Sequence, residues 1–174
     1  MTQELRAELV GLLPRLRRFA YGLTGSLDDG DDLVQGACER ALRRFDQFQA
    51  GTRLDSWMYR IVQNLWIDQR RARQIRPEAG VEPADLEALA VGDAEREVNS
   101  RLVLAHVQRA VAALPEEQRA ILLLVCVEGQ SYKAAADVLE IPLGTVMSRL
   151  ARARLAVGRA LEGESIATAS QAKG

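Results

Sequence analysis

The sequence predicts an all-α protein built from two small helical domains, and three observations support this prediction. Alanine, leucine and arginine abound whereas aromatic residues make up only 5% of the 174 residues, a composition that favours helices. Apolar residues reach 48%, which is enough for packed cores. Prolines, glycines and acids gather in one central segment. We therefore predict a first domain over residues 1–76, a flexible acidic linker over 77–98, a second domain over 99–162 and a tail over 163–174.

The first domain is expected to open with a helix over residues 3–25. A kink or break is expected between Gly11 and Pro14, because proline has no backbone N–H to donate. Residues 26–30 follow as a predicted turn.

Two further helices complete the first domain. The second is expected to begin at Asp31 or Asp32, since acidic groups favour a helix N-terminus, and to run to about Asp46. A loop over residues 47–53 leads to a third helix over residues 54–73.

The third helix carries an apolar stripe and a polar row beside it. The stripe consists, at helical spacing, of Leu54, Trp57, Met58, Ile61 and Leu65. Core packing therefore explains the tryptophan of this stripe better than a DNA contact does. The polar row is able to reach nucleic acid, although a solvated face explains it equally well; its members are Arg60, Asn64, Ile67 and Arg71. Tyr59 and Trp66 are expected to add exposed aromatic surface, on which single-stranded bases stack.

The second domain contains a helix-turn-helix pattern. Its helices are predicted at residues 99–113, 116–127, 131–139 and 143–161. Ser131 is suited to cap the third of them, and Pro142 separates the third from the fourth. In such a motif the second helix enters the DNA major groove. The inward face of that helix is predicted to be Val146, Leu150, Ala153 and Val157, and its outward arc to carry Thr145, Ser148, Arg149, Arg152 and Arg159.

The net charge of −1 hides two basic segments. Residues 53–76 hold six arginines and two acids, a net charge of +4, and residues 143–161 hold four arginines and no acid. Residues 77–99 hold seven acids and one arginine. Phosphates respond to local charge, so both basic segments are candidate DNA contacts.

Other classes of function are disfavoured. Cys38 and Cys126 lie far apart in apolar helical patterns, which favours buried thiols over a disulfide. His106 is the single histidine and has no partner motif, so we expect neither a metal site nor a cofactor. No phosphate-binding loop or nucleophile motif indicates an enzyme. No apolar run approaches the length of a membrane span, and no signal peptide is visible, so a cytoplasmic protein without membrane insertion is expected.

Three segments, taken in order, resemble the extracytoplasmic-function (group IV) RNA polymerase sigma factors. Residues 31–35 (DDLVQ) resemble the polymerase-binding segment, and residues 55–64 (DSWMYRIVQN) resemble the segment that melts and reads the minus-10 element. Leu114-Pro115, Ser131-Tyr132 and residues 142–149 (PLGTVMSR) resemble the domain that reads the minus-35 element.

The resemblance implies roles for particular residues. Core RNA polymerase would be bound through its clamp helices and flap, with the clamp helices facing Asp32, Leu33, Gln35, Glu39 and Arg43. The minus-10 element would meet Arg40, Gln47, Phe48, Gln49, Ala50, Gly51, Thr52, Arg53, Arg60, Asn64 and Arg71. The minus-35 element would meet Tyr132, Lys133, Thr145, Met147, Ser148, Arg149 and Arg152. An anti-sigma protein is a further implied partner.

The sequence departs from the family pattern at four positions, and one other interpretation stays open. Gly36 stands where the family usually has glutamate; Lys133, Met147 and Ala151 bear on minus-35 preference. The alternative is a one-component helix-turn-helix regulator, which leaves the basic segment of the first domain without a purpose. A single fused globule with Arg60, Arg71, Arg149 and Arg152 all in internal ion pairs would argue against the sigma-factor interpretation.

Overall fold

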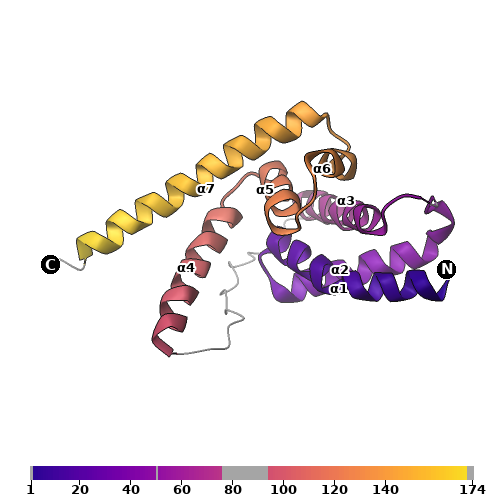
Figure 1. The fold of residues 1–174 in the computed structure, drawn as a ribbon, viewed down its shortest axis with the longest axis horizontal. Coiled ribbons are helices and arrows are strands. Elements are labelled where there is room, and N and C mark those ends of the chain that lie inside the picture. The colour runs from indigo at the N-terminus through magenta and orange to yellow at the C-terminus, as the bar shows by residue number, and fades with distance from the viewer. Residues whose placement is uncertain (1, 50, 76–93, 172–174) are drawn as a thin grey trace.

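The computed structural model describes residues 2–49, 51–75 and 94–171, and throughout these ranges every regular element is a helix (Figure 1). The N-terminal module contains α1 (Gln3–Thr24), α2 (Leu27–Arg43), the short 3₁₀-helix η1 (Phe45–Gln47) and α3 (Leu54–Ile75). The C-terminal module contains α4 (Ala94–Ala112), α5 (Glu116–Leu122), the π-helix η2 (Leu123–Val127), α6 (Tyr132–Leu139) and α7 (Leu143–Gln171). The predicted all-α class is confirmed. Most of the predicted linker, residues 76–93, lies outside the described residues.

Helix α1 is continuous, so the predicted break near Gly11 is wrong. The helix runs through Pro14, which removes one backbone donor, while the neighbouring turns bury Leu12 and Leu16 and hold the helix in place. It ends at Gly25, whose φ of 74° is a left-handed conformation suited to glycine.

Helix α2 begins earlier than predicted. Ser26 is its N-cap and accepts a hydrogen bond from the backbone N–H of Asp29 at 3.3 Å, so residues 27–30 of the predicted turn are helical instead. Gly30 is buried against α1, and a Cβ there would lie 3.2 Å from the backbone nitrogen of Tyr21. The missing side chain thus lets two helix backbones approach closely.

The C-terminal module follows the predicted order with longer outer helices. Helix α4 begins at Ala94, inside the predicted linker, and α7 continues to Gln171, beyond the predicted end at Leu161. The predicted inward face of α7 is confirmed, with Val146, Leu150 and Ala153 buried and Val157 partly buried.

The two modules share one continuous apolar core. Helix α1 contacts α4, α5 and η2, and α3 contacts α6 (Figure 1). The core runs from Leu16, Phe19 and Leu23 of α1 to Ile121 and Leu124 of the C-terminal module.

Three aromatic or sulfur-containing side chains differ from expectation. Tyr59 is fully buried and Trp66 is 4% exposed, so neither offers a stacking surface. Both lie on the side of α3 that packs into the core, which is wider than the predicted stripe. Cys126 is exposed rather than buried, Cys38 is partly buried, and both are free thiols.

Candidate nucleic-acid interface

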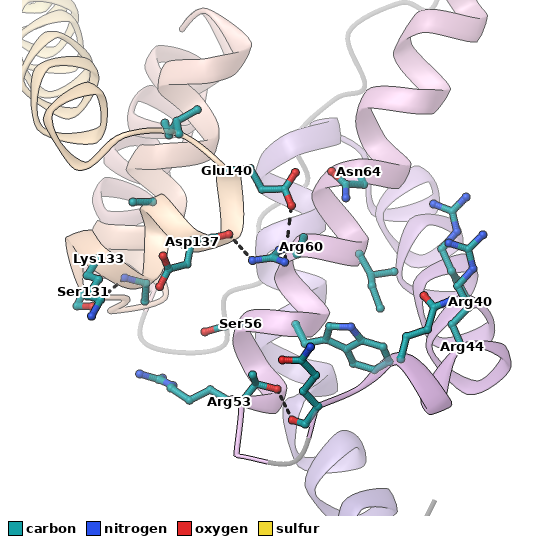
Figure 2. Close-up of a pocket in the computed structure, with 18 of the residues that line it drawn as sticks. Arg40, Arg44, Arg53, Ser56, Arg60, Asn64, Ser131, Lys133, Asp137 and Glu140 are labelled. Atoms are coloured by element: carbon teal, nitrogen blue, oxygen red, sulfur yellow. Dashed lines mark hydrogen bonds and ion pairs between the residues drawn. The ribbon is translucent and has the colours of Figure 1, made fainter.

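A cleft of about 1170 Å³ separates the N-terminal module from the first helix of the helix-turn-helix. Figure 2 shows basic side chains of α2 and α3 on one wall and the residues of α6 on the other. We call this space the intermodule cleft. Its N-terminal wall consists of Arg40, Arg44, Gln47, Gln49, Thr52, Arg53, Ser56, Trp57, Arg60, Ile61 and Asn64. Its C-terminal wall consists of Ser131, Lys133, Ala134, Ala136, Asp137, Glu140, Ile141 and Pro142.

Most of the residues implied for minus-10 contact lie on the N-terminal wall. Those that line the cleft are Arg40, Gln47, Gln49, Thr52, Arg53, Arg60 and Asn64. Phe48, Gly51 and Arg71 are not part of its lining, and Ala50 lies outside the described residues. The sequence interpretation did not single out Arg44 or Ser56, although the spacing of Arg44 four residues after Arg40 is a helical signal that would have found it.

Two of the cleft arginines, Arg40 and Arg53, have partners within their own module. Arg53 forms a two-pronged pair with Asp55, at 3.0 and 2.6 Å. Arg40 lies 3.6 Å from Asp68. Pairing leaves these cations correctly oriented along the wall while neutralising part of their charge.

Arg60 is bound by the opposite wall of the cleft. Its Nη2 donates to the carbonyl oxygen of Asp137 at 2.5 Å, and its Nη1 lies 3.7 Å from the carboxylate of Glu140 (Figure 2). Both partners belong to the helix-turn-helix. In this arrangement the C-terminal module binds Arg60, a side chain of the predicted minus-10 surface.

An aromatic cluster supports the loop before α3. Phe48 lies 5.7 Å from Phe45 and 5.2 Å from Trp57, measured between ring centroids. Trp57 is partly buried in this cluster and also lines the cleft, so core packing, the favoured interpretation, accounts for only part of its surface. Phe48 is partly buried in the same packing and does not line the cleft.

Asp55 joins this wall to the second module. It is 7% exposed and accepts hydrogen bonds from Arg53 and from Nε2 of Gln130, the latter at 3.1 Å. Burial alone would raise the pKa of Asp55, but the hydrogen bonds from Arg53 and Gln130 outweigh it and hold the pKa below its usual value.

The helix-turn-helix has the expected local geometry. Ser131 caps α6 through a 3.1 Å hydrogen bond from the N–H of Ala134. Glu140 ends α6 with a φ of 54°, and Pro142 precedes α7. A left-handed conformation at a non-glycine residue is uncommon, and it produces the sharp turn that sets α7 across α6.

The residues implied for minus-35 contact lie mainly at the surface of this motif. Tyr132, Lys133, Met147, Ser148 and Arg152 are exposed, and Thr145 and Arg149 are partly exposed. Arg149 pairs with Glu117 of α5 at 2.6 Å, and the hydroxyl of Ser148 donates to the carbonyl of Thr145.

The residues implied for polymerase contact form a strip on α2, with one correction. Asp32, Gln35, Glu39 and Arg43 are exposed. The carboxylate of Glu39 accepts hydrogen bonds from Gln35 at 3.4 Å and from Arg43 at 3.1 Å. Leu33 is fully buried in the core and cannot face a partner, so its assignment is wrong. Leu33 shares the apolar face of this amphipathic helix with Ala37, four residues further on, which is also buried.

Two other kinds of site are absent from the part of the chain that the structure describes. Within it, no group of three or more histidine, cysteine, aspartate or glutamate side chains is arranged to hold a metal ion. None of the described helices combines the length and apolar character that a membrane span needs.

Comparison with known proteins identifies the family. Residues 104–157 match the family model "Sigma-70, region 4", and residues 9–63 match "Sigma2 domain of PhyR". The chain is 36% identical over 154 residues to the ECF RNA polymerase sigma factor EcfG of Rhodopseudomonas palustris, covering 88% of this chain and 83% of that relative. This chain belongs to the ECF RNA polymerase sigma factors.

The chain is also similar to other ECF sigma factors and to solved sigma-factor structures. SigW of Bacillus subtilis is 28% identical over 170 residues, covering 91% of this chain and 90% of the relative. The sigma factor RpoE of Bartonella quintana, solved in complex with the anti-sigma factor NepR, matches with a TM-score of 0.79 and 28% identity over 92% of this chain and 98% of that one. Sigma factors direct transcription initiation by RNA polymerase, and this chain is one of them. The members of this family are not enzymes.

The arrangement expected to argue against a sigma factor is only partly present. The modules are packed together, and Arg60 and Arg149 lie in ion pairs. Arg71 and Arg152 are exposed and form no ion pair with the residues described here. The compact arrangement thus engages some of the candidate DNA contacts of an ECF sigma factor and leaves others open.

Proposed function

We propose that this protein binds core RNA polymerase and directs it to promoters by recognising minus-10 and minus-35 elements with separate modules. The observation that carries the proposal is the pair of cationic surfaces, one along α3 beside Asn64 and one on the helix-turn-helix around Arg152. Each surface is supported by a helix whose opposite face is buried. Two such surfaces suit two separated DNA elements contacted by one polypeptide.

In this function the N-terminal module holds an unpaired minus-10 base. Gln47, Gln49 and Thr52 of the segment before α3 line the same cleft as Asn64, so an extruded base has amide and hydroxyl partners there. Arg40, Arg53 and Arg60 supply charge for the phosphates. The exposed strip on α2 would contact the clamp helices of the polymerase, and the C-terminal module its flap.

The partner set includes an anti-sigma protein. RpoE, the relative with a similar fold, was solved with an anti-sigma factor, and the same kind of partner is proposed for this chain. The protein would act in the cytoplasm, where its polymerase acts, with no cofactor and no catalysis of its own.

Run-off transcription with purified core polymerase tests the function. The chain should confer initiation at a promoter that core polymerase alone ignores. A one-component regulator would instead bind its operator without polymerase. Binding of an anti-sigma protein without any transcription would instead indicate an antagonist of anti-sigma proteins. PhyR, an anti-anti-sigma factor solved in complex with NepR, is a protein of that kind.

The variant Asn64→Ala tests the assignment within the cleft. It should lower the yield of open promoter complex, read by permanganate reactivity of unpaired thymines, with little change in polymerase affinity. Gln69→Ala, which removes an amide from α3 away from the cleft lining, is the matched control. Equal loss of promoter opening and polymerase binding in the Asn64 variant would contradict the assignment.

A further inference from the structure

The junction between the modules contains a buried carboxylate that is held entirely from the other side. The side chain of Glu128 follows η2 in the C-terminal module and is 0% exposed. Arg15 donates to it at 3.3 Å, Arg18 at 3.2 Å through two nitrogens, and the hydroxyl of Tyr59 at 2.7 Å. All the hydrogen bonds that the described residues make to this carboxylate come from α1 and α3.

Steric fit at the same junction is equally specific. Gly22 of α1 faces Leu123 of η2, and a Cβ at Gly22 would lie 2.6 Å from a methyl carbon of that leucine. The absence of a side chain at Gly22 therefore leaves the space that the Leu123 side chain fills. Beside it, Gln130 donates to Asp55 across the junction.

This junction and the cleft are coupled by the rigid helix-turn-helix. When Glu128 is held, α6 lies against α3, and Arg60 is bound by Asp137 and Glu140. A duplex separates the minus-10 and minus-35 elements of a promoter by tens of ångströms, at about 3.4 Å per base pair. Surfaces that lie against each other across one cleft cannot both engage such elements.

We propose that the contacts of Glu128 with Arg15, Arg18 and Tyr59, together with the seat of Leu123 on Gly22, hold the free chain in a closed state that withholds the minus-10 surface from DNA. A buried ion pair is a device that selects one arrangement more than a large net source of stability. Closure is thus specific and readily displaced by a partner that binds the open arrangement more tightly. This inference rests on the proposed function for its consequence, but closure itself does not.

Two variants of the full chain test closure by independent means. Gly22→Leu places a side chain between α1 and η2 without changing charge, in a helix where leucine is favourable. Glu128→Lys sets a cation against Arg15 and Arg18, and the C-terminal module loses no internal hydrogen bond, because the carboxylate makes none there among the described residues. Asp31→Lys is the charge control, since it reverses an exposed partner of Arg17 within the N-terminal module.

Small-angle X-ray scattering gives the first readout. The radius of gyration should rise in Gly22→Leu and Glu128→Lys and should stay unchanged in Asp31→Lys. Circular dichroism verifies that each variant is folded, and Gly22→Leu alone decides the matter if Glu128→Lys does not fold. Folded variants as compact as the parent chain would overturn the proposal.

Anisotropy with a labelled promoter duplex carrying an unpaired minus-10 segment gives the second readout, at fixed salt. Gly22→Leu should bind about tenfold more tightly than the parent, because opening no longer reduces the apparent affinity. A larger radius with unchanged affinity would overturn the masking of the minus-10 surface and leave closure standing. Opening without DNA binding or run-off transcription in any variant would instead count against the proposed function.

Discussion

The two candidate DNA-facing surfaces differ in how far their positive charge is already engaged. On the N-terminal module, Arg40, Arg53 and Arg60 all have internal partners, and those of Arg60 belong to the other module. On the helix-turn-helix, Arg149 pairs with Glu117 of its own module, whereas Arg152 and Lys133 are exposed without an ion pair among the described residues. Packing of the modules therefore covers part of the N-terminal surface and leaves the surface on the helix-turn-helix more accessible in the free chain.

The largest expected effect tests whether the modules fold as one unit. Leu124→Ala in the fully buried core of η2 should cost about 2–5 kcal/mol of stability. Both tryptophans, Trp57 and Trp66, lie in α3 of the other module. Their fluorescence should therefore report the same loss in chemical denaturation, because the apolar core is continuous.

The exposed Leu42 provides the control for that experiment, and Leu42→Ala should change stability little. If the tryptophan transition stays at its original denaturant concentration in Leu124→Ala while circular dichroism shows an earlier phase, the modules fold independently and the shared core contributes less than its burial implies.

The accessible surface is tested by Arg149→Ala. Loss of a base contact should weaken minus-35 binding by about 1–3 kcal/mol, measured by competition between promoters that differ in that element. Glu117→Ala breaks the same 2.6 Å ion pair but keeps the arginine, and so it should leave binding intact. Equal weakening in both variants would mean that the pair positions α7 and that Arg149 reads no base.

Asp55, which joins the two modules, predicts that the stability of the chain depends on pH. Because the pKa of Asp55 is lowered in the folded chain, its contribution to stability is present above its ordinary value of 3.8 and is lost as the pH falls below that value. Asp55→Asn should therefore be less stable than the parent near neutral pH, and the two curves should converge in acid. A difference that is constant across urea unfolding curves from pH 3 to pH 7 would contradict this account.

The smallest effect concerns Gly36 on helix α2. A Cβ there would make an ordinary 3.8 Å contact with Leu65, so Gly36→Ala should stabilise the chain by about 0.5–1 kcal/mol. Gly30→Ala on the same helix should destabilise it, since its Cβ would press on the backbone of Tyr21. Thermal unfolding of the two variants should shift in opposite directions.

Local signals in the sequence predicted much of the fold. The order of the helices, the start of α3 at Leu54 and the break at Pro142 all depend on residues close to one another in the chain. The predicted start of α2 is too late, because a serine followed by aspartates is typical of a turn as well as of a helix cap, and Ser26 is a cap.

The site was predictable only in part, since long-range packing decides which polar and aromatic groups are covered. The spacing of Arg60 and Asn64 on one helix predicts that they share a face, and both line the cleft. Tyr59 was expected at the surface, but it packs edge-on against Phe19 at 5.2 Å and donates to Glu128. Nothing near Glu128 in the sequence indicates that arginines more than a hundred residues away surround it.

The π-helix η2 makes the junction sensitive to the number of residues before Glu128. Its wide turn is closed by the N–H of Glu128 donating to the carbonyl of Leu123, five residues earlier, at 2.9 Å. Deleting one residue from this turn would restore α-helical winding, because α-helical hydrogen bonds span four residues and π-helical ones span five. The length of this five-residue segment therefore matters as well as its composition, because the wide turn leads directly into Glu128, whose carboxylate meets Arg15 and Arg18.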